Sequence, residues 1–239
     1  MPLSRFAFVV TIRRYDALRR NLCVSALERK CFSLYDRPMK YERISTHQPA
    51  GAAVLQPKVT GALMRSALIE LARHGYANFS LGAVARRANV GKPSLYRRWR
   101  GKPELVADML LHFGISVVTV EDMGSLQREL EEYAQRSIAM LERRLARAIL
   151  PDVYGELARN TALSEHIRVH FQEPKREQAM RIIDRAIARG EVPPTADSGL
   201  ALDLMAGPLY WHLMITKDPV TDDFAAKFAK AIAGALKAC

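Results

Sequence analysis

The chain has 239 residues, 49% of them apolar and 26% charged, which is the ordinary composition of a globular protein with a large core. It contains no run of 18 apolar residues, no secretory signal pattern, and only three cysteines without a CxxC pair. A membrane-spanning helix, a disulfide framework and a zinc ribbon are therefore excluded, and we expect a cytoplasmic protein.

The net charge of +11 is confined to the N-terminal half of the chain. Residues 1–56 hold 10 Lys and Arg against 4 Asp and Glu, residues 57–113 hold 10 against 3, and residues 114–239 hold 16 against 18. A merely well-solvated surface would spread its charge more evenly. The asymmetry therefore indicates one region that faces a polyanion and another with a different task.

Residues 1–56 are predicted to be a basic extension, flexible or partly helical. They show no clear hydrophobic period and end in a Pro/Gly/Ala-rich stretch, Gln48–Ala53, of the kind found in linkers. No function is assigned to this extension, and Met39 is a candidate for a later start of the chain.

From Pro57 onward the sequence predicts helices throughout and an all-α fold, because no alternating strands bounded by turns occur. Residues 57–113 form the first predicted domain. Its opening helix spans 58–74, and Gly75 is placed to end it with a left-handed backbone conformation. Ser80 is placed to cap a short helix over 81–88.

A three-residue link, Asn89–Gly91, separates that helix from another over 92–99, which has Pro93 in its first turn. Asn tolerates a left-handed conformation, and Gly91 adds further backbone freedom. Two short helices joined by such a turn have the spacing of a helix-turn-helix. The next helix opens at Lys102 and runs toward Phe113.

The helix over 92–99 is predicted to bury Leu95 and Trp99, because these residues lie four apart on one face. The same placement is expected to turn its basic and hydroxyl side chains outward, namely Lys92, Ser94, Tyr96, Arg97 and Arg98. A helix fits the DNA major groove, where Arg pairs with guanine or phosphate and hydroxyl groups reach phosphates. The alternative, an ordinary charged surface helix, accounts for neither the three-residue turn nor the local positive charge.

These residues resemble the DNA-binding domain of TetR-type transcriptional regulators. The resemblance rests on Gly75, Ser80, Val84-Ala85, Asn89-Val90-Gly91, Leu95-Tyr96, Trp99 and Lys102-Pro103-Glu104-Leu105. Asn89 stands where the family usually has Gly, and the extension before Pro57 is longer than the usual arm.

The resemblance implies an N-terminal three-helix helix-turn-helix domain joined by a long helix to a C-terminal helical domain for ligand binding and dimerisation. Carried over by position, it assigns DNA contacts to Gly91, Lys92, Ser94, Tyr96, Arg97, Arg98 and Lys102. Ser80 is expected to contact DNA as well. The resemblance assigns the core of that domain to Val84, Val90, Leu95 and Trp99. It also implies that the last two helices form a four-helix interface with a second subunit.

Residues 114–239 form the second predicted domain, with helices at 125–148, 152–159, 162–171, 174–189, 197–215 and 222–237. The helix breaks are placed at Gly124, Pro151, Gly190, Pro193-Pro194 and Pro219.

The homodimer interface is expected to draw on Leu204, Trp211, Phe224, Phe228, Ile232 and Leu236. The same apolar stripe could instead close a monomer core, and its spacing does not separate the two. A two-fold dimer would read a palindromic operator in double-stranded DNA.

Aromatic and Met residues of the second domain are candidates for a pocket that takes a small hydrophobic effector. These are Tyr133, Tyr154, Phe171, Met180 and Tyr210. The same residue types at helical spacing also build plain cores. His166 and His170 would share a helix face, but without a third ligand no metal is predicted, and no other cofactor is.

The predicted function is sequence-specific DNA binding by a transcriptional regulator. The family's usual mode is repression that a small-molecule ligand relieves. No enzyme is predicted, since GxGxxG, GxxxxGK[ST], GxSxG and HExxH are all missing from the sequence. The alternative is a nucleic-acid-binding protein driven by charge alone. Such a protein would bind without sequence preference, whereas a regulator prefers its site by about 10³-fold or more.

Overall fold

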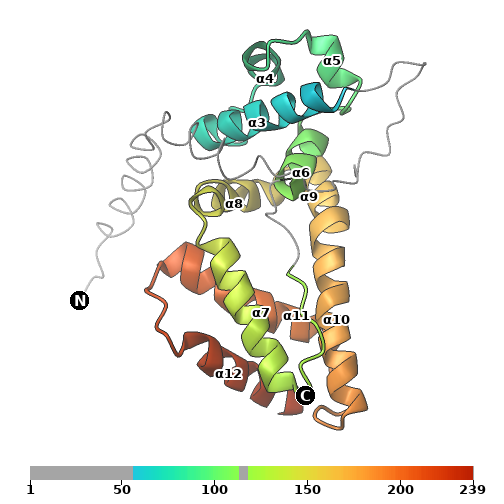
Figure 1. Cartoon of the computed structure of the whole chain (residues 1–239), viewed down its shortest axis with the longest axis vertical. Helices are drawn as coiled ribbons and strands as arrows, with labels where there is room; N and C mark the ends of the chain where they lie inside the picture. Colours follow the sequence, from blue (N-terminus) through green and yellow to red (C-terminus); the bar gives the residue numbers. More distant parts are fainter. Residues whose placement is uncertain (1–55, 113–117, 239) are drawn as a thin grey trace. The chain divides into compact units, whose positions relative to one another are not determined.

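The computed structural model describes residues 56–112 and 118–238 (Figure 1). The predicted N-terminal extension lies outside these residues, apart from Gln56. All regular secondary structure in the described residues is helical, which confirms the predicted all-α class. The chain divides between Phe113 and Gly114 into two compact units, called unit 1 and unit 2 below.

Unit 1 is a small helical domain built around one buried core. Its described helices are α3 (Pro57–His74), α4 (Leu81–Arg87), α5 (Lys92–Tyr96) and α6 (Lys102–His112). Helix α3 contacts both α4 and α6, and α4 contacts α5. Side chains from all four helices meet in the core, where Leu63, Val84, Leu95 and Leu105 are at most 1% exposed. The fold of unit 1 thus fixes α5 through its neighbours.

Helix α3 ends just before Gly75, as its sequence predicts, but the ψ of Gly75 is 174°, so its conformation is not the left-handed helical one that was expected. Gly75 has a φ of 70°, a region that glycine enters without steric cost. Its N–H donates to the Leu71 carbonyl at 2.9 Å and so satisfies one of the last carbonyls of the helix. The connecting helix α6 is described as far as His112, and Val118–Gly124 is not helical. The predicted long connecting helix therefore does not extend beyond residue 117.

Unit 2 is a bundle in which α12 lies along α7, and α10 contacts both α7 and α11 (Figure 1). Its helices in chain order are α7 (Leu126–Leu141), α8 (Arg144–Leu157), α9 (Thr161–Ile167), the π-helical turn η1 (Arg168–Gln172), α10 (Glu173–Ala188), α11 (Ser198–Tyr210), the π-helical turn η2 (Trp211–Thr216) and α12 (Phe224–Ala238). Gly190 ends α10 with a φ of 74°, in keeping with the predicted break.

The predicted break at Pro151 is wrong. Pro151 lies inside α8, and the predicted helix over 125–148 is instead divided after Leu141. A proline within a helix costs about 3 kcal/mol, because it removes one backbone hydrogen bond and crowds the preceding turn. Burial of Leu145, Ile149 and Val153 along one face of α8 offsets that cost, since each fully buried aliphatic side chain contributes about 1.5–3 kcal/mol.

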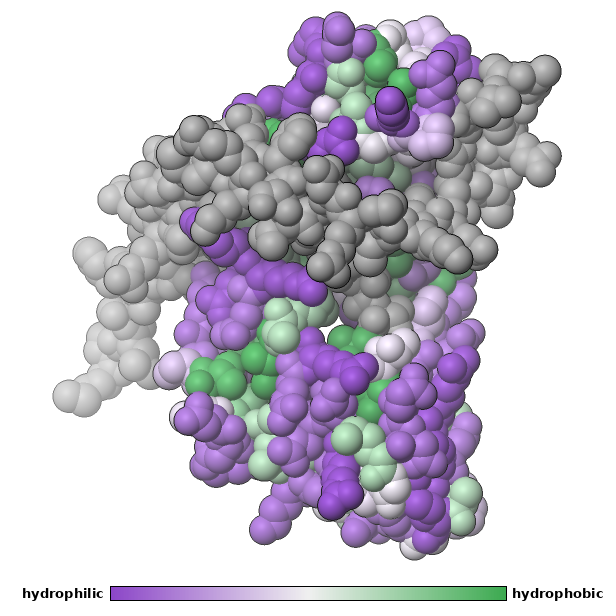
Figure 2. Space-filling view, in the orientation of Figure 1, coloured by the Kyte–Doolittle hydropathy of each residue, from purple (hydrophilic) through white to green (hydrophobic). Residues whose placement is uncertain are grey.

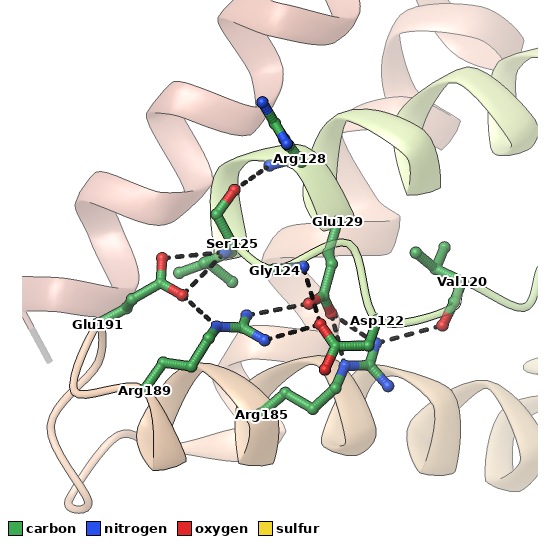
Figure 3. A network of polar contacts seen from close by, with 10 residues as sticks. Val120, Asp122, Gly124, Ser125, Arg128, Glu129, Arg185, Arg189 and Glu191 are labelled. Atoms are coloured by element: carbon green, nitrogen blue, oxygen red, sulfur yellow. Dashed lines mark hydrogen bonds and ion pairs between the residues drawn. The ribbon is translucent and has the colours of Figure 1, made fainter.

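Arginines of α7 and of the C-terminal end of α10 hold the non-helical segment Val118–Gly124 against the helices of unit 2. Arg136 donates to the Thr119 carbonyl at 2.6 Å, and Arg185 donates to the Val120 carbonyl at 3.2 Å. Arg189 donates to the carboxylates of Asp122 at 3.1 Å, Glu129 at 2.9 Å and Glu191 at 2.6 Å (Figure 3). We refer to these side chains together as the arginine clamp: Asp122, Glu129, Arg136, Arg185, Arg189 and Glu191.

Glu129 is the centre of the arginine clamp. Its carboxylate is completely buried and accepts hydrogen bonds from both Arg185, at 2.9 Å, and Arg189. Glu191 joins the clamp to the start of α7 by accepting the Leu126 N–H at 3.0 Å. The buried carboxylate is thus fully paired, as a charge removed from water must be.

Candidate nucleic-acid interface

The turn between α4 and α5 is built by local hydrogen bonds that the sequence encodes. Ser80 caps α4 by accepting the Ala83 N–H on its hydroxyl at 3.2 Å. At the other end, the Val90 N–H donates to the Ala85 carbonyl and the Asn89 N–H to the Arg86 carbonyl. This is the Schellman pattern, in which a residue with positive φ reverses the chain. The helix-turn-helix geometry follows from these caps.

Asn89 is the residue that takes the positive φ, at 53°. Gly91 is extended, with a φ of −69°, and serves as the residue before the first turn of α5. The backbone freedom predicted for Gly91 is therefore not used, because Asn89 alone supplies the reversal. Pro93 occupies the first turn of α5, where its missing N–H costs nothing.

Three of the four predicted core residues are fully buried. Val84 and Trp99 are 0% exposed and Leu95 is 1% exposed, whereas Val90 is half-buried at the turn. The Trp99 indole N–H donates to a carboxylate oxygen of Asp108 at 2.7 Å. Asp108 lies on α6 and is itself buried, so this bond joins the end of the helix-turn-helix to the next helix. The sequence reasoning did not identify Asp108.

The exposed side of α5 carries a lysine at its first residue and a phenol at its last, and an arginine follows directly after the helix. Lys92, Arg97 and Tyr96 are exposed, and Tyr96 keeps half of its surface open to solvent. Ser94 is half-buried. In α4, Gly82 leaves space for Lys92, because a Cβ added there would lie 3.3 Å from the Lys92 Cε. This arrangement gives a short rigid helix with donors on one side and apolar anchors on the other.

Arg98 does not face outward, and the expectation that both arginines of the pair do so is wrong. Arg98 is only 3% exposed. Its Nε donates to the Thr60 hydroxyl at 2.9 Å, and its Nη1 donates to the Ser94 carbonyl and hydroxyl at 2.7 and 2.8 Å. Arg98 lies three residues after the buried Leu95, so it shares the inward face of the helix.

Lys102 is held in place by aromatic side chains at the start of α6. Its ammonium lies 4.0 Å from the centroid of the Tyr76 ring and 5.9 Å from that of Phe79, and it donates to the Ala77 carbonyl at 3.4 Å. A cation over an aromatic face is attracted by the ring quadrupole. Lys102 is therefore a positioned positive charge next to the helix-turn-helix.

Comparison with known proteins accounts for this arrangement. Residues 63–109 match the family model described as bacterial regulatory proteins, tetR family, and residues 120–232 match the model for the tetracyclin repressor-like C-terminal domain. The chain is 33% identical over 173 residues to the DNA-binding transcriptional repressor TetR of Mycobacteroides abscessus, which covers 70% of this chain and 88% of that protein. The chain belongs to the TetR family of transcriptional regulators.

Other relatives of this TetR-family regulator agree. The HTH-type transcriptional regulator YdeS of Bacillus subtilis is 27% identical over 163 residues, which cover 68% of this chain and 82% of YdeS. The structure of Salmonella enterica GusR shares the fold, with a TM-score of 0.61 at 19% identity over 75% of this chain and 95% of that one. The predicted function, DNA binding by a transcriptional regulator, is confirmed at this level, and nothing favours binding by charge alone.

The predicted dimer stripe of this TetR-family chain lies largely inside the subunit. Phe228, Ile232 and Leu236 are 7%, 5% and 1% exposed, because they lie on the side of α12 that packs on α7. Their assignment to a subunit interface is therefore wrong. Phe224 is half-buried and stacks on His212, with 4.4 Å between the ring centroids.

The apolar surface that remains open comes mainly from α11 and η2. Leu200 is 45% exposed, Trp211 61% and Ile215 46%, and Leu204 is half-buried. On the outer side of α12, Gly234 is exposed, and a Cβ added there would meet no atom within 4 Å. On the face that Figure 2 shows, apolar residues reach the surface of unit 2 among hydrophilic ones.

The three tyrosines proposed for a pocket, Tyr133, Tyr154 and Tyr210, lie near one another. The Tyr154 and Tyr210 rings have centroids 5.0 Å apart. Burial raises the pKa of the Tyr133 phenol, a hydrogen bond with Ser137 opposes this shift, and the nearby Tyr154 adds to it. Phe171 is buried, and Met180 is half-buried on α10.

His166 and His170 stack with their ring centroids 6.0 Å apart. Among residues 56–112 and 118–238, no three His, Cys, Asp or Glu side chains are grouped as a metal site. No helix in the same residues is long and apolar enough to cross a membrane.

Proposed function

We propose that two copies of this regulator bind a palindromic operator, with the α5 helix of each copy in one of two successive major grooves. The observation that carries this proposal is the exposed row Lys92, Tyr96 and Arg97 on a helix whose other side, Leu95 and Trp99, is fully buried. A short helix held this firmly can enter the groove without paying to order itself at the moment of binding.

The proposed contacts differ in what they read. The guanidinium of Arg97 is proposed to bond a guanine edge, while Lys92 and Lys102 are proposed as phosphate contacts. Ser94, Tyr96 and Ser80 carry hydroxyl groups for phosphate oxygens. The Ser80 oxygen accepts the Ala83 N–H and still has its own proton to donate. Gly91 brings the backbone close to the duplex, and Arg98 is not part of this set.

The second copy is proposed to dock on the outer side of α11, η2 and α12. Leu200, Trp211 and Ile215 are exposed apolar side chains there, with the half-buried Leu204 among them. A large exposed tryptophan of this kind is a frequent anchor of an interface. One α5 helix reads only a few base pairs, so a two-fold pair is needed for a full site.

Repression with release by a small hydrophobic effector is the proposed mode of regulation. Tyr133, Tyr154 and Tyr210 supply aromatic faces and hydroxyl groups for such a molecule. An effector acts by preferring the subunit arrangement that does not fit two grooves, which lowers DNA affinity by a coupling of about 1–3 kcal/mol. The protein would meet its operator in the cytoplasm, and no catalytic step is part of the proposal.

The test begins with selection of duplexes from a randomised library by the full-length protein. Selected sequences should be palindromic and preferred over unrelated DNA by about 10³-fold at physiological salt, as measured by fluorescence anisotropy. Arg97→Ala is expected to weaken binding by about 10-fold or more and to relax one position of the site.

The matched control is Arg181→Ala, which removes an exposed arginine from α10 in unit 2 and should leave affinity unchanged. Failure to select any sequence, or equal effects of Arg97→Ala and Arg181→Ala, would overturn the proposed function.

A further inference from the structure

Arg98 links the helix that carries the exposed cations to the first turn of α3. Its Nε bonds the Thr60 hydroxyl at 2.9 Å, and its Nη1 bonds both oxygens of Ser94 at 2.7 and 2.8 Å. The Thr60 hydroxyl in turn lies 3.4 Å from the Gln56 carbonyl, to which it donates. One guanidinium thus joins Ser94 on α5 to the residues that begin α3.

The chemistry of this group suits it to hold two helices at a fixed angle. A guanidinium is planar and rigid, and it presents its N–H donors as a fork, so each bond it makes fixes the direction of the others. Arg98 is 3% exposed, and hydrogen bonds made by a charged group are stronger than those between neutral groups. Rotation of α5 relative to α3 would break such bonds and leave a largely buried guanidinium without these partners.

The same contacts fix the orientation of Ser94. Its hydroxyl oxygen accepts from Arg98, so the hydroxyl proton is the part of the group that remains for an outside acceptor. Ser94 is half-buried, in the turn of α5 between Lys92 and Tyr96. Arg98 therefore acts on both the angle of α5 and the direction in which a DNA-facing hydroxyl points.

We propose that Arg98 is a positioning residue for DNA recognition, and that Thr60 is its required partner. Arg98 sets α5 and Ser94 for the operator without touching DNA itself. This inference rests on the proposed function, because it needs an operator to be read. The inference predicts that operator affinity depends on the forked geometry of the Arg98 guanidinium, and that a positive charge alone at this position does not maintain that affinity.

Arg98→Lys tests this directly, because it keeps the charge and removes the fork. The probes are the duplex that the wild-type protein selects from a randomised library and an unrelated duplex of the same length. Arg98→Lys should bind the selected duplex about 10-fold or more weakly than the wild type does. That factor corresponds to the loss of one charged hydrogen bond. Its affinity for unrelated DNA, and the dependence of that affinity on salt, should stay within about twofold, because the exposed cations are unchanged.

Thr60 supplies the second, milder pair of variants. Thr60→Val keeps the shape of the side chain and removes the acceptor, so it should lose severalfold in affinity for the selected duplex. Thr60→Ser keeps the hydroxyl and should bind as the wild type does. The double variant Thr60→Val/Arg98→Lys should bind the selected duplex no more weakly than Arg98→Lys alone. The reason is that Thr60 is proposed to act only through its bond to the Arg98 guanidinium, which Arg98→Lys already removes.

Several results would overturn the inference. A phosphate contact by Arg98 would leave Arg98→Lys close to wild type, and a separate DNA contact by Thr60 would make the two losses additive. A general loss of folding would lower binding to both duplexes equally and would show in thermal melting. If the wild-type protein selects no sequence at all, the proposed function fails instead, so the two failures are distinguishable.

Discussion

The indole of Trp99 is closed off from solvent and donates its one hydrogen bond to Asp108, across the junction between the helix-turn-helix and α6. Asp108→Ala leaves that N–H buried without its acceptor, which should destabilise unit 1 by about 1–3 kcal/mol. Asp108→Asn keeps an oxygen that can accept and should cost less. Urea denaturation followed by Trp fluorescence measures both, and Asp184→Ala, an exposed acid on α10, is the control. Equal midpoints for Asp108→Ala and the control would contradict this role.

Residue types and their spacing predicted the buried Val84, Leu95 and Trp99, but they misplaced Arg98. Its spacing from Leu95 already put it near the inward face, yet its charge favoured solvent. The burial depends on acceptors from Thr60, which is distant in sequence, and on Ser94 in the preceding turn. Asp108 was missed for the same reason, because a buried acid is recognised only when its partner, here an indole, is known to face it.

At the scale of elements, the arginine clamp predicts how unit 2 responds to acid. The pKa of Asp122 is lowered, chiefly by the hydrogen bond from the Gly124 N–H and further by Arg189 and Arg185. Burial opposes ionisation of Glu191, but bonds from Arg189 and the Leu126 N–H outweigh it and lower that pKa as well. Carboxyl groups with lowered pKa values in the folded state stabilise it above their ordinary pKa values, 3.8 and 4.5. That stabilisation is lost as pH falls through the lower, folded values.

The urea midpoint of unit 2 should therefore drop as pH is lowered from about 5 toward 3. Asp122→Asn and Glu191→Gln should each lower the midpoint at pH 7 and flatten its dependence on pH, so that the curves approach the wild type under acid. Circular dichroism in a pH series measures this, with Glu177→Gln, an exposed residue of α10, as the control. Curves that stay parallel to the wild type at every pH would exclude a contribution from the clamp.

Helix α12 carries a second prediction at this scale. Phe228 packs between α12 and α7 and is 7% exposed, so Phe228→Ala should destabilise unit 2 by about 3–5 kcal/mol. Lys230→Ala, an exposed change on the same helix, should stay within about 0.5 kcal/mol of wild type. Chemical denaturation at several protein concentrations distinguishes core from interface. A Phe228→Ala variant that melts normally as a monomer and fails only to associate would restore the interface assignment.

At the scale of the whole molecule, assembly should depend on Trp211. Its side chain is 61% exposed, and Trp211→Ala should weaken the dimer by about 30-fold, the effect of an anchor worth about 2 kcal/mol, with an unchanged helical spectrum. Analytical ultracentrifugation at micromolar concentration measures the shift. Tyr96→Ala is the matched control, since it removes another exposed aromatic, from unit 1, and should leave assembly intact. A wild-type protein that sediments only as a monomer would rule out the homodimer.

The all-α class and most helix ends followed from periodicity and from capping residues such as Ser80 and Gly75. Periodicity does not tell which surface covers an apolar stripe, a helix of the same subunit or a second subunit. The stripe along α12 satisfies the pattern of an interface and of a core equally well, and only the packing of α7 decides for the core. Pro151 is a parallel case, because the burial that keeps α8 intact is a property of unit 2 as a whole.

Because α12 turns its large apolar side chains toward α7, its outer side carries lysines and small residues, and Gly234 has open space around it. A larger side chain at that position would cost the lone subunit little beyond the change in helix propensity. The larger side chain would collide only with a second molecule that packs on this side of α12. In the proposed dimer, Gly234 is thus a point where a substitution should alter the affinity of one copy for another while the interior of each copy stays as it is.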